Sequence, residues 1–197
     1  MSRPSRVSEK RREILPALAD AFTELGYRRA TTQSLARRCG IQENVLYRLW
    51  PDKKAMFIAA IEHVYDFSET TWLRLLETAP ADGGGARRLL EFESIHHGEF
   101  GHYRIIFTGL GETDDPEIRK ALKSMFTRFH RFLLAQLVSQ PKRGRSGAGI
   151  PPALAAWAFI GLGTVANIGR ELGALGDSDR KRLIATVGQF LLGSGDQ

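Results

Sequence analysis

Residues 32–49 read TQSLARRCGIQENVLYRL, and their pattern is that of two short helices joined by a tight turn. Ala36 and Gly40 are four positions apart, which places them on one helical face, and a small residue at position 36 lets two helices approach closely. Glycine at position 40 permits the left-handed backbone that such a turn requires. The stretch therefore predicts a helix-turn-helix, although an ordinary corner between two helices has the same pattern.

The apolar residues of this corner are able to form a small core of their own: Leu35, Ile41, Val45, Leu46 and Leu49. With these inside, the outer side of the second helix carries polar side chains, which are Gln42, Glu43, Asn44, Tyr47 and Arg48. Such groups reach base edges and phosphates in a major groove. The amides of Gln42 and Asn44 suit adenine. Arg48 suits guanine and Glu43 suits cytosine, so no single operator sequence follows.

The positive charge of the chain is concentrated at its N-terminal end. The net charge is +6, and residues 1–56 hold 12 Lys and Arg against 6 Asp and Glu, whereas the two kinds balance over residues 57–197. A basic module on a neutral body indicates a polyanionic partner for that module. A solvated basic surface without a partner is the alternative that charge alone leaves open.

The composition is that of a globular protein, with 43% apolar residues. The longest apolar stretch, residues 152–168, is interrupted by Gly161 and Gly163 and falls short of the roughly 20 residues that cross a bilayer. The basic N-terminus has no apolar region behind it, so no signal peptide is expected. A single cysteine, Cys39, excludes an internal disulfide and fits a reducing compartment, so we predict a cytoplasmic protein in which Cys39 is a small residue of the turn.

Helical periodicity runs along most of the chain, and no segment shows sustained strand alternation. After a basic arm over residues 1–8, the first helix is expected to kink or to have a loose first turn at Pro16 and to end at Gly26. We predict an all-α fold of about nine helices, with domains at 1–52 and 53–197. The expected helices are 9–25, 31–38, 43–50, 52–78, 86–99, 103–108, 117–139, 152–172 and 178–192.

Residues 14–57 resemble the tetracycline-repressor (TetR) family. The matching pieces occur in the family's order: Phe22, Gly26-Tyr27, Thr31-Thr32, Leu35-Ala36, Gly40-Ile41, Leu46-Tyr47 and Lys53 before an apolar helix. Departures occur at Gln42, at Glu43 and at Leu49-Trp50, which put the base preference in doubt. The resemblance implies an N-terminal helix-turn-helix DNA-binding domain and a C-terminal helical bundle that holds a ligand pocket and dimerisation helices.

The resemblance also implies specific contacts with DNA phosphates. Thr32 caps a helix whose N-terminus faces a phosphate, and Tyr47 donates its hydroxyl to a backbone phosphate. Lys53 opens a helix, where the dipole disfavours a cation, and this placement makes sense if a phosphate lies near that end. Arg3 and Arg6 of the basic arm are candidates for the adjacent minor groove or for the DNA backbone, and a disordered tail is the alternative. The predicted DNA-binding residues are Thr32, Gln33, Arg37, Gln42, Glu43, Asn44, Tyr47, Arg48 and Lys53.

Two further sites are expected in the body of the chain. By resemblance, the last two helices pair with those of a second copy, and the two recognition helices then lie about 34–36 Å apart. The alternative is that the apolar faces of these two helices form a core within one chain. The predicted interface residues are Trp157, Gly161, Val165, Ile184, Val187, Phe190 and Leu191. A ligand pocket is predicted among aromatic and histidine side chains, which also serve core packing, at Trp72, Phe92, His96, Phe100, Tyr103, Phe107, Phe126, Phe129 and His130.

The resulting hypothesis is a homodimeric transcriptional regulator, a repressor released from a palindromic operator in double-stranded DNA by a small-molecule inducer. The alternative is a helical small-molecule-binding protein or enzyme whose basic front end is incidental, and a third possibility is a regulator that senses nothing. No Gly-rich phosphate loop or nucleophile elbow is found, so we expect no enzyme and no cofactor. Adjacent histidines at 96 and 97 point about 100° apart on a helix, so no metal site is expected.

Overall fold

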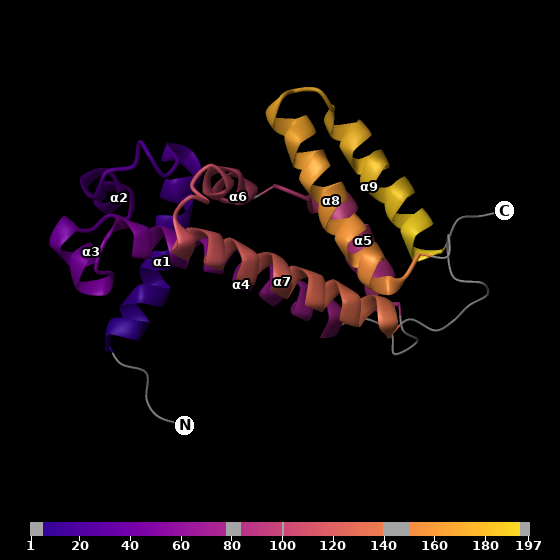
Figure 1. Ribbon diagram of the computed structural model, residues 1–197, viewed down its shortest axis with the longest axis horizontal. Helices are drawn as coiled ribbons and strands as arrows, with labels where there is room; N and C mark the ends of the chain where they lie inside the picture. Colours follow the sequence, from indigo (N-terminus) through magenta and orange to yellow (C-terminus); the bar gives the residue numbers. More distant parts are fainter. Residues whose placement is uncertain (1–5, 78–83, 100, 140–149, 194–197) are drawn as a thin grey trace. The chain divides into compact units, whose positions relative to one another are not determined.

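The computed structural model describes residues 6–77, 84–99, 101–139 and 150–193, and these parts contain nine α-helices and no strand (Figure 1). The all-helical prediction is therefore confirmed. The basic arm is shorter than predicted, because α1 already begins at Arg6 and runs unbroken through Pro16. The helices are α1 Arg6–Leu25, α2 Thr32–Arg38, α3 Glu43–Leu49, α4 Lys53–Glu77, α5 Gly85–His96, α6 Tyr103–Leu110, α7 Pro116–Val138, α8 Pro152–Glu171 and α9 Asp177–Leu192.

The helices form two compact units. The first unit contains residues 1–67 and 100–125, and the second contains residues 68–99 and 126–197. Helices α4 and α7 each contribute their N-terminal part to the first unit and their C-terminal part to the second. The division of the chain after residue 52 stays a prediction.

The core of the first unit is built around the aromatic ring of Phe22 on α1. This ring meets Phe57 of α4 edge-on, with 5.0 Å between the ring centroids, and lies 6.5 Å from the ring of Tyr27. Phe22, Phe57, Leu35 and Leu46 are all fully buried, so α1, α2, α3 and α4 share one core. Burying such side chains contributes about 1.5–3 kcal/mol each relative to leaving them exposed, which orients the two short helices.

In the second unit, α9 packs against both α5 and α8. Leu90, Ala166 and Ile184 form the buried cluster between them, and the helices approach closely at Gly188, where an added Cβ would lie 2.1 Å from Leu90 Cδ1. Glycine is therefore required at position 188 by space rather than by backbone angle.

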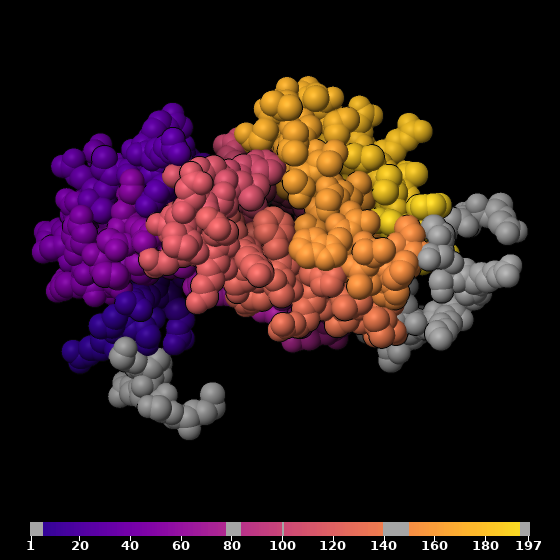
Figure 2. Space-filling view, in the orientation of Figure 1, coloured from indigo at the N-terminus to yellow at the C-terminus, as the bar shows by residue number. Residues whose placement is uncertain are grey.

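Helix α8 continues through Gly161 and Gly163, so the predicted helix over residues 152–172 is confirmed as one continuous element. By length and composition α8 would be able to cross a membrane, but a single such helix is weak evidence, because core helices of soluble proteins have the same properties. Only 28% of its most apolar window is buried inside the chain. Figure 2 shows part of the surface of α8 and α9 (orange and yellow).

Candidate nucleic-acid interface

The predicted turn between α2 and α3 is present, and its geometry depends on Gly40. Gly40 has φ +65°, in the left-handed region, and the Ile41 amide donates to the carbonyl of Ala36 at 3.0 Å. No atom lies within 4 Å of the place where a Cβ would be, so glycine is favoured here by its backbone conformation alone.

The sequence left Thr31 and Thr32 as candidates for the N-cap of α2; the structure has Thr31 as the cap and Thr32 as the first helical residue, so the role of cap that the resemblance implied for Thr32 is wrong. The Ser34 amide donates to Thr31 Oγ1 at 3.1 Å, and the Thr31 amide donates to Ser34 Oγ at 3.0 Å. This capping box satisfies two backbone donors that the helix leaves unpaired. The Thr32 side chain is consequently free of a capping role.

The small core of the corner is narrower than the sequence predicted. Leu35, Leu46 and Leu49 are buried, but Ile41 and Val45 are only half-buried. These two side chains line a cleft on the surface instead of sealing the core. The outer face of the corner is exposed as predicted, at Gln33, Arg37, Gln42, Asn44, Tyr47 and Arg48.

Thr32, Glu43 and Tyr47 form one hydrogen-bonded cluster across α2 and α3. The Thr32 hydroxyl donates to a carboxylate oxygen of Glu43, and the Tyr47 hydroxyl donates to Thr32 Oγ1 at 3.2 Å. Thr32 and Glu43 are half-buried, whereas Tyr47 is 50% exposed. The two hydroxyls predicted to face phosphates are thus engaged with each other and with an acidic side chain.

Lys53 anchors the loop between α1 and α2. Its Nζ donates to the carbonyl oxygens of Tyr27 and Ala30, each at 3.0 Å, and lies 4.5 Å from the centre of the Tyr27 ring. An ammonium has three donors, so these contacts leave one for another acceptor. The Ala55 amide donates to Asp52 Oδ1 at 2.7 Å, so Asp52 caps the N-terminus of α4.

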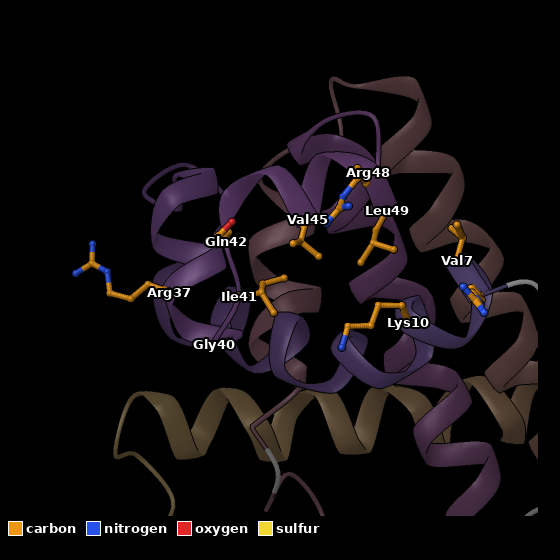
Figure 3. A pocket seen from close by; sticks show the side chains of 10 residues that line it. Val7, Lys10, Arg37, Gly40, Ile41, Gln42, Val45, Arg48 and Leu49 are labelled. Atoms are coloured by element: carbon orange, nitrogen blue, oxygen red, sulfur yellow. The ribbon is translucent and has the colours of Figure 1, made fainter.

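An open cleft of ≈ 620 Å³ runs beside the recognition helix (Figure 3). Ile41, Val45 and Leu49 point into it, with Lys10 and Arg48 on opposite sides. Its floor is apolar and its rim is cationic, and no acidic residue lines it. The lining residues are Arg6, Val7, Lys10, Arg37, Gly40, Ile41, Gln42, Val45, Arg48 and Leu49. A cleft of this charge attracts polyanions.

Of the α1 residues that line this cleft, Arg6 was a candidate for DNA contact from the sequence, whereas Val7 and Lys10 were not. Lys10 and Val7 extend the predicted surface onto α1, and the basic residues near the start of α1 were the available signal. Arg11 holds α1 in place, because its Nε donates to the Leu49 carbonyl at 2.6 Å and its guanidinium lies 5.9 Å from the centre of the Trp50 ring.

The predicted ligand-pocket residues do not all come together. In the second unit Trp72 contacts Phe129, with ring centroids 5.6 Å apart, and Phe92 contacts His96 at 4.6 Å. The His130 ring stacks on Trp157, its centroid 4.9 Å away, and Phe126 is half-buried. Tyr103 and Phe107 pair with each other in the first unit, with centroids 5.8 Å apart. Phe100 lies outside the described residues.

A half-buried polar network centres on His97, the neighbour of the histidine selected from the sequence. Its Nδ1 is 2.7 Å from Glu93 Oε2, and its Nε2 is 3.0 Å from both the Gly163 carbonyl and Asn167 Nδ2. Glu93 also accepts a hydrogen bond from Trp72 Nε1 at 2.7 Å. The four-residue spacing of Glu93 and His97 on α5 was the signal available in the sequence.

Within the described residues no group of three or more His, Cys, Asp or Glu side chains is placed to hold a metal ion. Burial raises the pKa of the Cys39 thiol to about 11, which keeps it protonated at neutral pH. Burial also lowers the pKa of His63, and the nearby His102 lowers it further.

The predicted interface residues fall into two groups. Trp157, Val165 and Phe190 are about half exposed, and Gly161 is exposed with nothing within 4 Å of an added Cβ. Ile184, in contrast, is 5% exposed and belongs to the core of its own unit, while Val187 and Leu191 are half-buried.

The N-terminal part of the chain matches a known family. The family model described as bacterial regulatory proteins of the tetR family covers residues 14–60. The nucleoid occlusion factor SlmA of Haemophilus influenzae (strain PittGG) is 42% identical over 59 residues, which are 29% of this chain and 27% of that protein. The chain therefore spans about a quarter of the length of this relative.

Two solved structures show that the fold of the whole chain is shared. A TetR-family regulator from Rhodococcus sp. has a TM-score of 0.78 at 16% identity, and the match covers 94% of this chain and 99% of the other. A transcriptional regulator from Saccharomonospora viridis, solved in complex with choline, has a TM-score of 0.73 at 20% identity, covering 89% and 94%. At these identities the likeness concerns the fold.

Proposed function

We propose that this chain, which belongs to the tetR family of bacterial regulatory proteins, is a transcriptional regulator that binds double-stranded DNA through α3 and the basic cleft beside it. One observation carries the proposal. The polar face of α3 is exposed at Gln42, Asn44 and Arg48, directly next to the cationic rim of the cleft. Base-reading side chains flanked by phosphate-binding cations are what a duplex requires.

The regulator acts as a homodimer that joins through α8. Apolar side chains recur along this helix and its end at spacings of three, four, four, three and four: Leu154, Trp157, Gly161, Val165, Ile168 and Leu172. Five of them are 43% to 75% exposed. An apolar stripe with this period packs against the same stripe of a second copy in an antiparallel or crossed helix pair. The two-fold axis of such a dimer presents both copies of α3 to a palindromic DNA site.

The dimer is a repressor that a small molecule releases from its operator. The aromatic side chains of the second unit around Trp72 and Phe129 are candidates for the ligand site. Support comes from the similar regulator solved with choline. Ligand binding then shifts the dimer toward a geometry in which the two reading helices no longer match the half-sites. Regulators of this family are generally not enzymes, and we extend this to the present chain, which would act in the cytoplasm.

The experiment is a selection of bound fragments from a genomic library by the full chain, followed by anisotropy titrations of a recovered duplex. Binding that is sequence-dependent and that weakens steeply with salt supports the proposal. Arg48→Ala is expected to change the preferred sequence, whereas Lys120→Ala, an exposed cation on α7, serves as the control. Turnover of a substrate by a chain that binds no duplex would contradict the proposal in favour of a helical enzyme.

A further inference from the structure

The cluster of Thr32, Glu43 and Tyr47 places a carboxylate inside the proposed reading surface. Thr32 lies at the start of α2, and Glu43 and Tyr47 lie one turn apart on α3. The Thr32 hydroxyl donates to Glu43, and the Tyr47 hydroxyl donates to Thr32 Oγ1 at 3.2 Å. Glu43 is half-buried beside exposed neighbours, Gln42 and Asn44.

Each hydroxyl has a single proton to donate. The proton of Thr32 is directed to Glu43, and that of Tyr47 is directed to Thr32, so neither is available to a second acceptor. A phosphate oxygen that approached Thr32 would meet a carboxylate already bound there. Since hydrogen bonds to ionised acceptors are about twice as strong as neutral ones, this contact is a real competitor.

We propose that Glu43 is an internal substitute for a DNA phosphate, which occupies the Thr32 hydroxyl in the free protein and must be displaced when a duplex binds; the Tyr47 hydroxyl is held in the same cluster through Thr32. The proposal rests on the DNA-binding function proposed above. It makes Glu43 a restraint on binding to DNA of any sequence, because each duplex has to break the Thr32–Glu43 contact and to bring a phosphate near a negative charge.

Displacement gives the carboxylate a second role. Glu43 is in the first turn of α3, between Gln42 and Asn44, and a carboxylate in the major groove accepts from the N4 amino group of cytosine. A duplex with cytosine at the facing position compensates for the broken Thr32 contact. A duplex that lacks cytosine at this position leaves the displaced Glu43 carboxylate facing the bases without a hydrogen-bond donor. The same side chain thereby lowers affinity for random DNA and increases the ratio between specific and random binding.

The test measures dissociation constants of the full chain for two duplexes of equal length. One has random sequence, and the other is recovered by selection with the unmodified protein. Glu43→Gln is expected to tighten binding to the random duplex about fivefold, since it keeps the shape and removes the charged acceptor. The ratio of the two dissociation constants is expected to narrow by a similar factor. Glu62→Gln removes an equal charge from an exposed position of α4 and is expected to change neither.

A second set of variants separates this competition from a general charge effect. In a Thr32→Val background, which removes the contested hydroxyl, Glu43→Gln is expected to change random-duplex affinity less than twofold. In a Thr32→Ser background, which keeps it, the full effect should return. The inference is overturned if Glu43→Gln and Glu62→Gln change the affinity for the random duplex equally. It is also overturned if Glu43→Gln tightens that binding as much in the Thr32→Val background as in the parent chain. An unmodified chain that binds neither duplex would instead overturn the proposed function.

Discussion

Arg11 Nε donates to the carbonyl oxygen of Leu49 at 2.6 Å, and this bond fastens the first turns of α1 to the last residue of α3. The recognition helix has only seven residues, too few to be stable by itself, so its position depends on contacts with longer helices. Arg11 also lies over the ring of Trp50, the C-cap residue that follows α3. The two contacts together fix the width of the cleft that α1 and α3 enclose.

Replacement of Arg11 by alanine is expected to lower the free energy of unfolding by about 1–2 kcal/mol, because the Leu49 carbonyl loses a charged donor. Duplex binding should weaken as well, since α3 is held less firmly. Urea denaturation and anisotropy titrations measure the two effects. Arg12→Ala removes a neighbouring exposed cation of the same charge and serves as the control. Equal effects of both variants would show that charge, and not the Leu49 contact, is responsible.

Two glycines provide a contrast between backbone strain and lack of space. Gly40→Ala is expected to cost about 1–2 kcal/mol, because alanine is strained at φ +65° although nothing lies near its Cβ. Gly40→Asn should cost less, since asparagine tolerates the left-handed region. Gly188→Ala should lower the stability of the fold more than either Gly40 variant, because the added Cβ would lie 2.1 Å from Leu90. Thermal unfolding of the three variants gives the order, and a Gly188 variant as stable as the parent would contradict the assignment.

The helix-turn-helix was predictable because its determinants are local. A glycine in the left-handed region and a helix-spaced set of leucines act within 18 residues, and the structure has both Gly40 and the buried Leu35 and Leu46 where they were expected. The α1 side of the cleft was not predictable in this way. Val7 and Lys10 line the cleft beside α3, and the start of α1 is held there by the bond from Arg11 to the Leu49 carbonyl, a contact between residues 38 positions apart.

Polar side chains were harder to assign than apolar ones, because one position has several possible partners. The sequence placed a phosphate near Lys53, whereas two backbone carbonyls already accept from it. The sequence likewise selected His96, which lies toward Glu99, while its neighbour His97 makes the contacts with α8. Whether His96 or His97 faces α8 depends on a rotation of α5 about its axis by one residue. Packing against distant parts of the chain sets that rotation.

His63 makes stability dependent on pH. Its pKa is lowered, first by burial and then by the nearby His102, while Asp66 and Asp20 act in the opposite direction. A lowered pKa in the folded state means that the neutral form is favoured by folding. The contribution of neutral His63 to the stability of the fold is therefore fully present above the pKa of the unfolded state, about 6.5. It is lost as the pH falls through the lower pKa of the folded state. Denaturation at pH 7.5 and at pH 5 is expected to show a smaller decrease for His63→Phe than for the parent chain.

The cations at the rim of the cleft should be measurable as salt dependence. Arg37→Ala and Lys10→Ala are each expected to reduce the slope of log K against log salt concentration by about 1, because each releases one counterion on binding a phosphate. Lys120→Ala, on α7, should leave the slope unchanged. Slopes that are identical for all three variants would exclude the rim from the interface while leaving α3 to be tested separately.

In the proposed dimer, the exposed stripe of α8 joins the two copies. Trp157 and Val165 are 48% and 53% exposed in the single chain, and a charge at either position would be buried against the second copy in the proposed dimer. Val165→Asp is therefore expected to yield a monomer in sedimentation velocity, with a helical content equal to that of the parent. Binding to a two-half-site duplex should weaken by at least about tenfold, because each reading head then binds alone. Leu110→Asp introduces the same charge at a 49% exposed apolar position of α6 and should remain dimeric. A dimeric Val165→Asp chain would place the interface elsewhere.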